Sequence, residues 1–145
     1  MATPQARGLV ALRLCLGVFF VYEALSKVGW FLDSGPLVKQ LEGWLASAGP
    51  WNRWYLQIIC LPGAPIFARV VPIAEVSTGI ALLLGAYVRP VSVLAILMVL
   101  NFHFSSGQLF KYPSIMNNGY FLPVVGGLLA LALGAVSLPL SLMKK

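Results

Sequence analysis

The chain has 145 residues, of which 59% are hydrophobic and 10% are charged, and its mean hydropathy is +0.88. This composition excludes a soluble monomer, because soluble domains are about half apolar and about a quarter charged. Its 12% aromatic content excludes a disordered chain. The net charge of +6 comes from scattered lysines and arginines, which favours the basic flanks of membrane helices and no nucleic-acid partner. We expect one integral membrane domain over residues 1–145, with room for about four spans of about 20 residues and none for a separate soluble catalytic domain.

The first expected span covers residues 8–31 and ends where Asp33, Gly35 and Pro36 interrupt the apolar run. Its start could be taken for a signal peptide, but Arg13 interrupts the apolar region and no small-residue cleavage site follows. Residues 36–47 carry apolar side chains at helical spacing, yet the segment is too short and too polar to span. We therefore expect an amphipathic helix that lies at the membrane interface.

Three further spans are expected at residues 66–87, 91–110 and 120–140. The short link at residues 88–90 predicts a tight antiparallel hairpin between the second and third spans. Residues 56–63 are apolar but contain Pro62 and Gly63, which indicates a short surface or re-entrant piece. The expected fold is all-α: a four-transmembrane-helix bundle with an interfacial helix between spans one and two.

Basic residues and tryptophans predict how the bundle is oriented. On one side of a four-span chain the basic residues lie in very short segments, and on the other side they are spread through a long loop. The higher density of positive charge in the short segments predicts that both termini lie in the cytoplasm. The basic residues of the short segments are Arg7, Arg89, Lys144 and Lys145, and those of the other side are Lys39, Arg53 and Lys111. The long outer loop and its flanks hold all four tryptophans, which indicates an aromatic belt or a docking surface: Trp30, Trp44, Trp51 and Trp54.

Ionisable residues inside spans are costly, so their depth is informative. Glu23, Glu75 and His103 all lie about 11–13 Å from the outer ends of the first three expected spans. Lys27 follows Glu23 by four residues and can pair with it. We expect a polar layer inside the bundle at this level, with further polar side chains at or near it: Tyr22, Asn101, Ser106, Asn117 and Asn118.

Two readings of this layer stay open. In the first it is a structural network, with Glu23 paired to Lys27 and Glu75 to Arg69 or His103. In the second it is a site that moves protons or binds a quinone carbonyl, with these candidate residues: Glu23, Lys27, Glu75, His103 and Asn101.

The remaining polar residues have simpler interpretations. The polar layer could also contact a neighbouring subunit, and His103 is a candidate axial ligand of a haem or pigment. The long side chain of Arg13 is expected to reach the headgroups. Cys15 and Cys60 lie far apart with no CxxC motif, so we expect no metal site and interpret both as small apolar residues.

Several short motifs resemble those of the DoxX family of small bacterial membrane proteins. They are Arg13-Leu-Cys-Leu-Gly17, Lys27, Glu75 with Gly79, Leu82-Leu-Leu-Gly85 and Arg89, of which Lys27, Glu75 and Arg89 match the family's lysine, acidic and basic positions. The family is related to the DoxD-type subunit of thiosulfate:quinone oxidoreductase. This chain departs from the family in having Leu25-Ser26 where a glycine often precedes the lysine, and Ser137-Leu138-Pro139 where the last span often ends in Ser-Leu-Asp.

The resemblance implies a place in a membrane redox system of the bacterial cytoplasmic (inner) membrane, commonly beside soluble sulfur or oxygen-defence proteins. With one histidine, no paired cysteines and no nucleotide fingerprint, we expect an accessory subunit with no cofactor of its own and no catalytic residues. Its partners would be the lipid bilayer and other membrane subunits, with a quinone, lipid or pigment at their interface. The alternative is a quinone-reactive subunit that uses Glu23, Glu75 and His103. A transporter ranks last, because one polar layer gives no continuous path.

Overall fold

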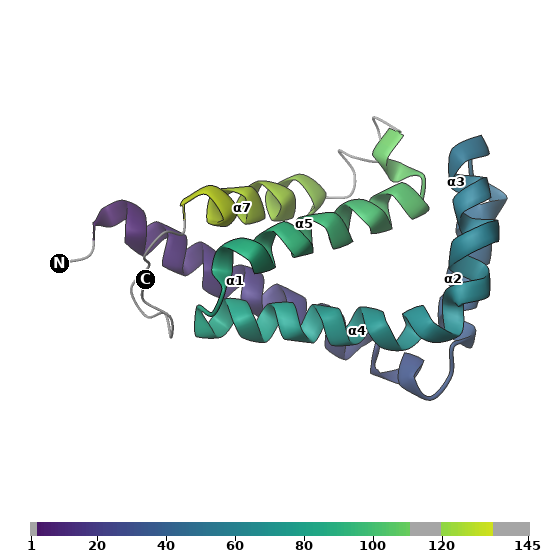
Figure 1. Cartoon of the computed structure of the whole chain (residues 1–145), viewed down its shortest axis with the longest axis horizontal. Coiled ribbons are helices and arrows are strands. Elements are labelled where there is room, and N and C mark those ends of the chain that lie inside the picture. Colours follow the sequence, from purple (N-terminus) through teal and green to yellow (C-terminus); the bar gives the residue numbers. More distant parts are fainter. Residues whose placement is uncertain (1–2, 111–119, 135–145) are drawn as a thin grey trace.

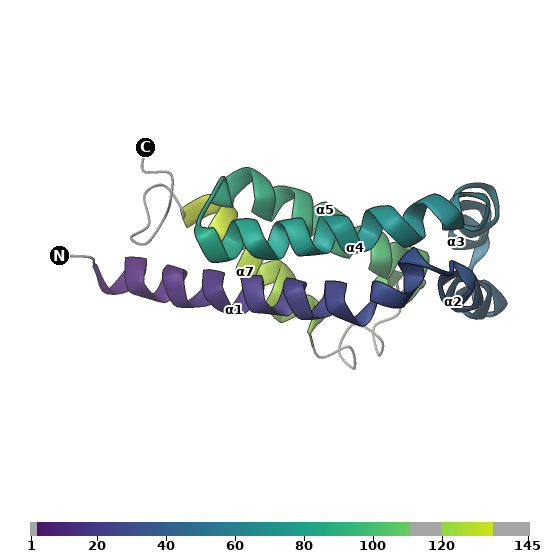
Figure 2. The ribbon, with the colours of Figure 1, turned by 90° about the horizontal axis from the view of Figure 1, so that it is seen from below.

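The computed structural model describes residues 3–110 and 120–134, which are helical apart from short connections. Four helices lie along the long axis of the molecule: α1 (Pro4–Ser26), α4 (Leu61–Leu84), α5 (Val88–Ser105) and α7 (Phe121–Gly134). Two shorter helices, α2 (Gly35–Ala46) and α3 (Pro50–Tyr55), lie side by side across one end of these four (Figures 1 and 2). The start of α1 and the end of α7 lie at the opposite end (Figure 1).

In the described part of the chain, three helices are long and apolar enough to cross a membrane. These are Pro4–Ser26, the continuous helical run Pro50–Leu84 and Val88–Ser105. The fourth expected span overlaps α7, whose 14 residues are apolar but reach only about 21 Å and are not among these three helices. Its expected continuation to residue 140 lies outside the described residues, as do Lys111, Asn117, Asn118, Lys144 and Lys145.

The helix α1 starts four residues before the expected start of the first span, and it ends five residues before the expected end. The side-chain oxygen of Thr3 accepts a hydrogen bond from the backbone N–H of Ala6 at 3.2 Å, and Pro4 occupies the first turn, where its missing N–H costs nothing. The helix α1 ends at Ser26, and Val28–Phe31 form a short 3₁₀ helix, η1. The 24 residues of the expected first span are therefore divided between two helical elements.

The expectation of a separate element at residues 56–63 is wrong. A π-helical turn, η2 (Leu56–Cys60), joins α3 to α4 without a break, and Pro62 falls in the first turn of α4, where proline is tolerated. Leu56, Cys60, Ala64 and Ala68 recur every fourth residue and are buried against α2. This packing stripe holds the helix together where proline and glycine would locally interrupt it.

The hairpin between α4 and α5 confirms the expected tight link, which lies at residues 85–87 and not at 88–90. Gly85 ends α4 in the left-handed conformation with φ of 69°, and Tyr87 precedes α5 with φ of 49°. Glycine adopts this conformation without a steric penalty and commonly follows the last residue of a helix. Three residues therefore suffice to reverse the chain.

The bundle is centred on a close contact between α1 and α4. A Cβ atom on Gly79 would lie 2.8 Å from the carbonyl oxygen of Gly17, so the two backbones approach as only glycines allow. The expectation that Arg13 extends to the headgroups is wrong, since the residue is buried, with 1% of its surface exposed. Arg13 belongs to the same buried stripe of α1 as Val10 and Gly17, three or four residues away, and this position turns it toward the neighbouring helices.

Candidate functional site

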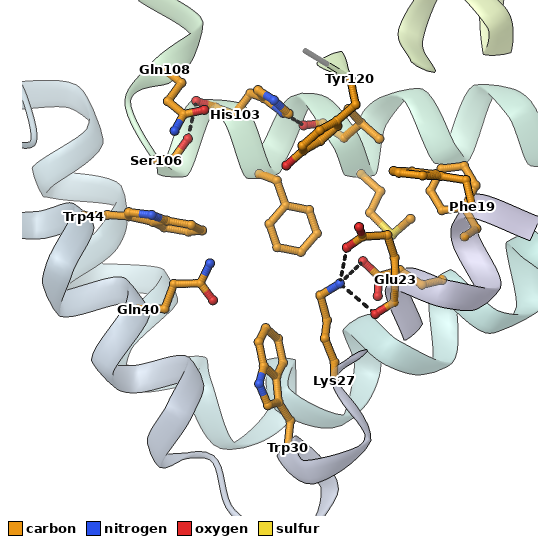
Figure 3. Close-up of a pocket in the computed structure, with 15 residues that line it drawn as sticks. Phe19, Glu23, Lys27, Trp30, Gln40, Trp44, His103, Ser106, Gln108 and Tyr120 are labelled. Atoms are coloured by element: carbon orange, nitrogen blue, oxygen red, sulfur yellow. Dashed lines mark hydrogen bonds and ion pairs between the residues drawn. The ribbon is translucent and has the colours of Figure 1, made fainter. Parts of the chain in front are cut away.

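A cavity of about 250 Å³ lies where the bundle meets the crossing helix α2. Side chains from α1, α2, α4 and α5 line it, together with residues of the connections between helices. Figure 3 shows Gln40 and Trp44 of α2 facing Phe19 and Glu23 of α1 across this space, with His103 on another side. The four helices thus bring residues from distant parts of the sequence to one partly open site.

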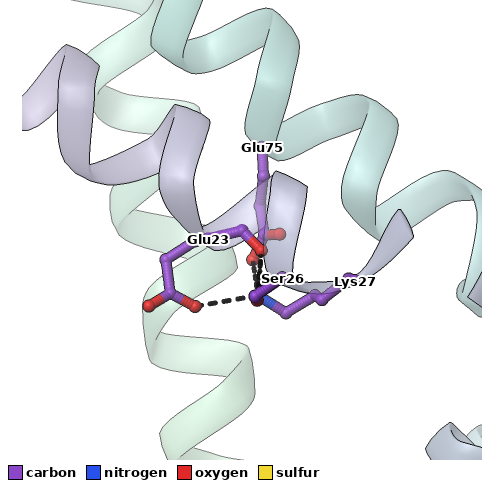
Figure 4. Close-up of polar contacts among 4 residues, drawn as sticks. All are labelled: Glu23, Ser26, Lys27 and Glu75. Carbon is purple, nitrogen blue, oxygen red and sulfur yellow. Dashed lines mark hydrogen bonds and ion pairs between the residues drawn. The ribbon is translucent and has the colours of Figure 1, made fainter. Parts of the chain in front are cut away.

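Lys27 is the centre of the polar part of the cavity. Its ammonium nitrogen lies 2.8 Å from Oε2 of Glu23 and 3.0 Å from Oε1 of Glu75. It also donates to the backbone carbonyl of Glu23 at 3.0 Å, one turn earlier on α1 (Figure 4). This single lysine, which directly follows α1, therefore bridges a carboxylate on α1 and one on α4 and ties the two helices together.

The three charged side chains differ in their exposure. The side chains of Glu75 and Lys27 are 5% and 12% exposed, whereas that of Glu23 is 41% exposed. The expected pair between Glu23 and Lys27 is confirmed, but the expected pairing of Glu75 with Arg69 or His103 is wrong. Arg69 lies six residues before Glu75 on the same helix and therefore on another face; it is exposed and donates to the backbone carbonyl of Pro65.

His103 of α5 is 5% exposed and lines the same cavity. Its Nδ1 lies 2.9 Å from the backbone carbonyl oxygen of Val99, and its ring centroid lies 4.1 Å from that of Phe121. Its Nε2 is buried and has no hydrogen-bond partner among the residues that the structure describes. The same holds for Oε2 of Glu75, so two buried polar atoms of cavity-lining residues are unsatisfied.

Asn101 does not join this group. It is exposed, and its Oδ1 accepts a hydrogen bond from the hydroxyl of Tyr55 at 2.7 Å, beside a smaller cavity of about 60 Å³. Tyr22 is 70% exposed and does not line the main cavity. Ser106 lines it, and its hydroxyl donates to the backbone carbonyl of His103 at 3.2 Å. Of the five candidates, Glu23, Lys27, Glu75 and His103 come together.

Aromatic rings form much of the remaining wall, including those of Phe19, Phe102 and Tyr120. Two of the four tryptophans are part of this wall: Trp30, whose ring centroid lies 5.9 Å from the Lys27 ammonium, and Trp44. The other two, Trp51 and Trp54, are 78% and 57% exposed. The predicted aromatic belt or docking surface therefore stays a prediction for the exposed pair.

No group of three or more histidine, cysteine or acidic residues that could hold a metal ion occurs in residues 3–110 and 120–134. Cys15 is exposed and Cys60 is buried, and both are free thiols. A role for His103 as an axial ligand of a haem or pigment stays a prediction.

Sequence reasoning missed several residues of the cavity, among them Phe19, Gln40 and Phe102. Phe19 could have been found, because it precedes Glu23 by four residues and therefore shares its helical face. Gln40 carried no such signal, since it reaches the cavity only because α2 folds across the end of the bundle. Phe102 lies beside His103 on an apolar helix whose rotation the sequence leaves open.

These features define a polytopic helical membrane protein with a partly open cavity, lined by an ion-paired group, where its long helices meet α2. A family model for DoxX matches residues 8–106, which is more than half of the chain. The protein belongs to the DoxX family, as its motifs indicated. No curated protein and no solved structure matches the chain.

Proposed function

We propose that the protein is a subunit of a larger membrane redox assembly and binds the headgroup of a quinone-class molecule in the cavity between α1, α2, α4 and α5. One observation carries this proposal: a cavity with aromatic walls has an ion-paired polar end and an unsatisfied imidazole nitrogen. A quinone headgroup is a flat ring with polar atoms on two sides and an apolar tail. Aromatic walls suit the ring, and convergent polar groups orient its oxygens.

Size and charge favour this class of ligand. Pockets for drug-sized molecules measure about 300–1,000 Å³, so a cavity of about 250 Å³ suits a single substituted ring. Two carboxyl groups, of Glu23 and Glu75, contact the single ammonium of Lys27. The polar end therefore offers little positive charge to the phosphate of a lipid headgroup, which favours a neutral ligand.

A purely structural network accounts for less. It explains why Lys27 lies between two carboxylates, since the ion pairs join α1 to α4. It gives no role to the cavity beside them or to the unsatisfied atoms of Glu75 and His103. The geometry therefore favours the quinone-binding alternative over a wholly structural polar layer, while the place in an assembly rests on the DoxX family.

Binding can be tested with the full chain in lipid nanodiscs and a short-tailed benzoquinone in equilibrium dialysis. Met98 lines the cavity and its neighbour Leu97 is 58% exposed on the outer face of the same helix. Met98→Trp fills the cavity and should weaken binding at least about tenfold, because the ring and the new side chain compete for one volume. Leu97→Trp is the matched control and should bind like the unmodified chain. Equal affinities for both variants, or no saturable binding, would contradict the quinone site.

The assembly is tested separately. Purification of the tagged chain from its native membrane in mild detergent should recover proteins that carry redox cofactors, at constant stoichiometry across a sizing column. Recovery of the chain alone, under conditions in which known membrane complexes of that membrane stay intact, would contradict the subunit role.

A further inference from the structure

The hydrogen-bonding state of His103 follows from its partner. A backbone carbonyl oxygen can only accept a hydrogen bond, so the Nδ1 atom 2.9 Å from the carbonyl of Val99 carries a proton. In the neutral ring the other nitrogen, Nε2, then has a lone pair and no proton. This buried atom without a partner in the described part of the chain is therefore an acceptor.

The charged group presents a second acceptor. Each of the three N–H bonds of the Lys27 ammonium can be assigned to one of the three oxygens within 3.0 Å of it, which leaves none for a ligand. Those contacts engage Oε1 of Glu75 and leave Oε2 without a partner among the described residues. Among the described residues that line the cavity, the buried polar atoms without a partner are thus Nε2 of His103 and Oε2 of Glu75. With a neutral imidazole and a carboxylate that stays ionised beside Lys27, both atoms are acceptors.

The other polar side chains of the cavity do not change this preference for a ligand that donates hydrogen bonds. Gln40, Gln108 and Tyr120 each carry a donor and an acceptor, so they suit either kind of ligand. The indole N–H groups of Trp30 and Trp44 are donors only, but both side chains are half-buried, and neither nitrogen is a buried atom that lacks a partner. The buried atoms therefore decide which hydrogen-bonding pattern is stabilised.

We infer that the cavity binds the reduced form of its ligand, a hydroquinone, in preference to the quinone, with hydroxyl groups donating to Nε2 of His103 and Oε2 of Glu75. This inference rests on the proposed function. A hydroquinone has two O–H donors, whereas the oxygens of a quinone only accept and would face acceptors of the protein. A hydrogen bond to a neutral acceptor strengthens binding about fivefold and one to a charged acceptor about 30-fold. Together they correspond to a preference on the order of 100-fold.

Three ligands that share the same substituted ring and the same short tail test the inference in nanodiscs under anaerobic conditions. They are the hydroquinone, the quinone and the dimethyl ether of the hydroquinone. The ether keeps the ring and its substituents but has lost both donors. We expect the hydroquinone to bind about 100-fold more tightly than either of the others, as measured by equilibrium dialysis.

Two variants assign the preference to its atoms. His103→Phe keeps a ring against Phe121 and removes the acceptor, and it should reduce the preference for the hydroquinone about fivefold. Glu75→Gln keeps the shape of the side chain and replaces a charged oxygen by an amide that has its own donor. It should reduce the preference for the hydroquinone at least tenfold, and it tests the inference independently of whether His103→Phe folds. Tyr22→Phe is the control, because Tyr22 lies on α1 next to Glu23 but outside the cavity.

The outcomes separate the inference from the proposed function. If the quinone binds as tightly as the hydroquinone, or the ether binds as tightly as the hydroquinone, the donor preference is wrong and the quinone-class site stands. If none of the three ligands binds saturably, the proposed function itself is wrong. A preference that survives in both His103→Phe and Glu75→Gln would also overturn the assignment to these atoms.

Discussion

Replacing Lys27 by methionine should be among the most damaging single substitutions in the polar layer. Methionine keeps most of the apolar stem of lysine but removes the charge that contacts Glu23 at 2.8 Å and Glu75 at 3.0 Å. The buried side chain of Glu75, 5% exposed, would remain without its cationic partner. Removing one member of a buried ion pair costs about 3–5 kcal/mol, whereas an exposed pair contributes about 0.2–1 kcal/mol. We therefore expect Lys27→Met to lower the free energy of unfolding by about 3–5 kcal/mol, and Glu23→Gln by less than about 1 kcal/mol.

The free energy of unfolding can be measured by titrating mixed micelles with SDS and following helicity by circular dichroism. Lys39→Met is the control for loss of a positive charge, since Lys39 is exposed on α2 and should change stability by less than about 0.5 kcal/mol. The double variant Lys27→Met, Glu75→Gln should recover most of the loss, because it removes the buried charge as well as its partner. Equal losses for Lys27→Met and Glu23→Gln, or a double variant no more stable than Lys27→Met, would refute the role of a buried pair.

Two further substitutions test how the helices are held around the cavity. Gly79→Ala should destabilise the bundle by about 1–3 kcal/mol, because its Cβ would lie 2.8 Å from the carbonyl oxygen of Gly17, while Gly8→Ala has nothing within 4 Å and should be neutral or stabilising in the same SDS titration. Asn52→Ala should cost about 1–2 kcal/mol, since the amide of Asn52 donates to the carbonyl of Phe104 near the end of α5, and the loss should appear as faster hydrogen exchange at that end of the helix; unchanged exchange would contradict this contact.

Much of the architecture was predictable because lipid restricts what a chain can do. Backbone groups inside a bilayer must be satisfied within the chain, so long apolar segments form helices, and the first and third expected spans coincide with α1 and α5 to within five residues at each helix end. The error at residues 56–63 arose from reading Pro62 and Gly63 as local breaks. The buried stripe from Leu56 to Ala68 against α2 outweighs that local preference, and the sequence does not reveal its partner surface.

Part of the site was also predictable, because helical rise converts sequence position into depth. This reasoning placed Glu23, Glu75 and His103 at one level, and all three line the cavity. Depth alone also included Asn101, which is exposed. Positions two apart on a helix face opposite sides, so Asn101 and His103 could not both point inward.

What the sequence determined by itself was therefore the class of the protein, the level of its polar layer and the pair between Glu23 and Lys27, which all depend on composition or on neighbours along one helix. Only the tertiary structure decided that Lys27 also reaches Glu75, that Arg13 is buried, and that α2 folds across the bundle and forms one wall of the cavity. These features depend on how each helix is rotated and which helix it contacts. Rotation and contact are set by close packing between elements distant in the sequence, such as the approach of Gly17 and Gly79.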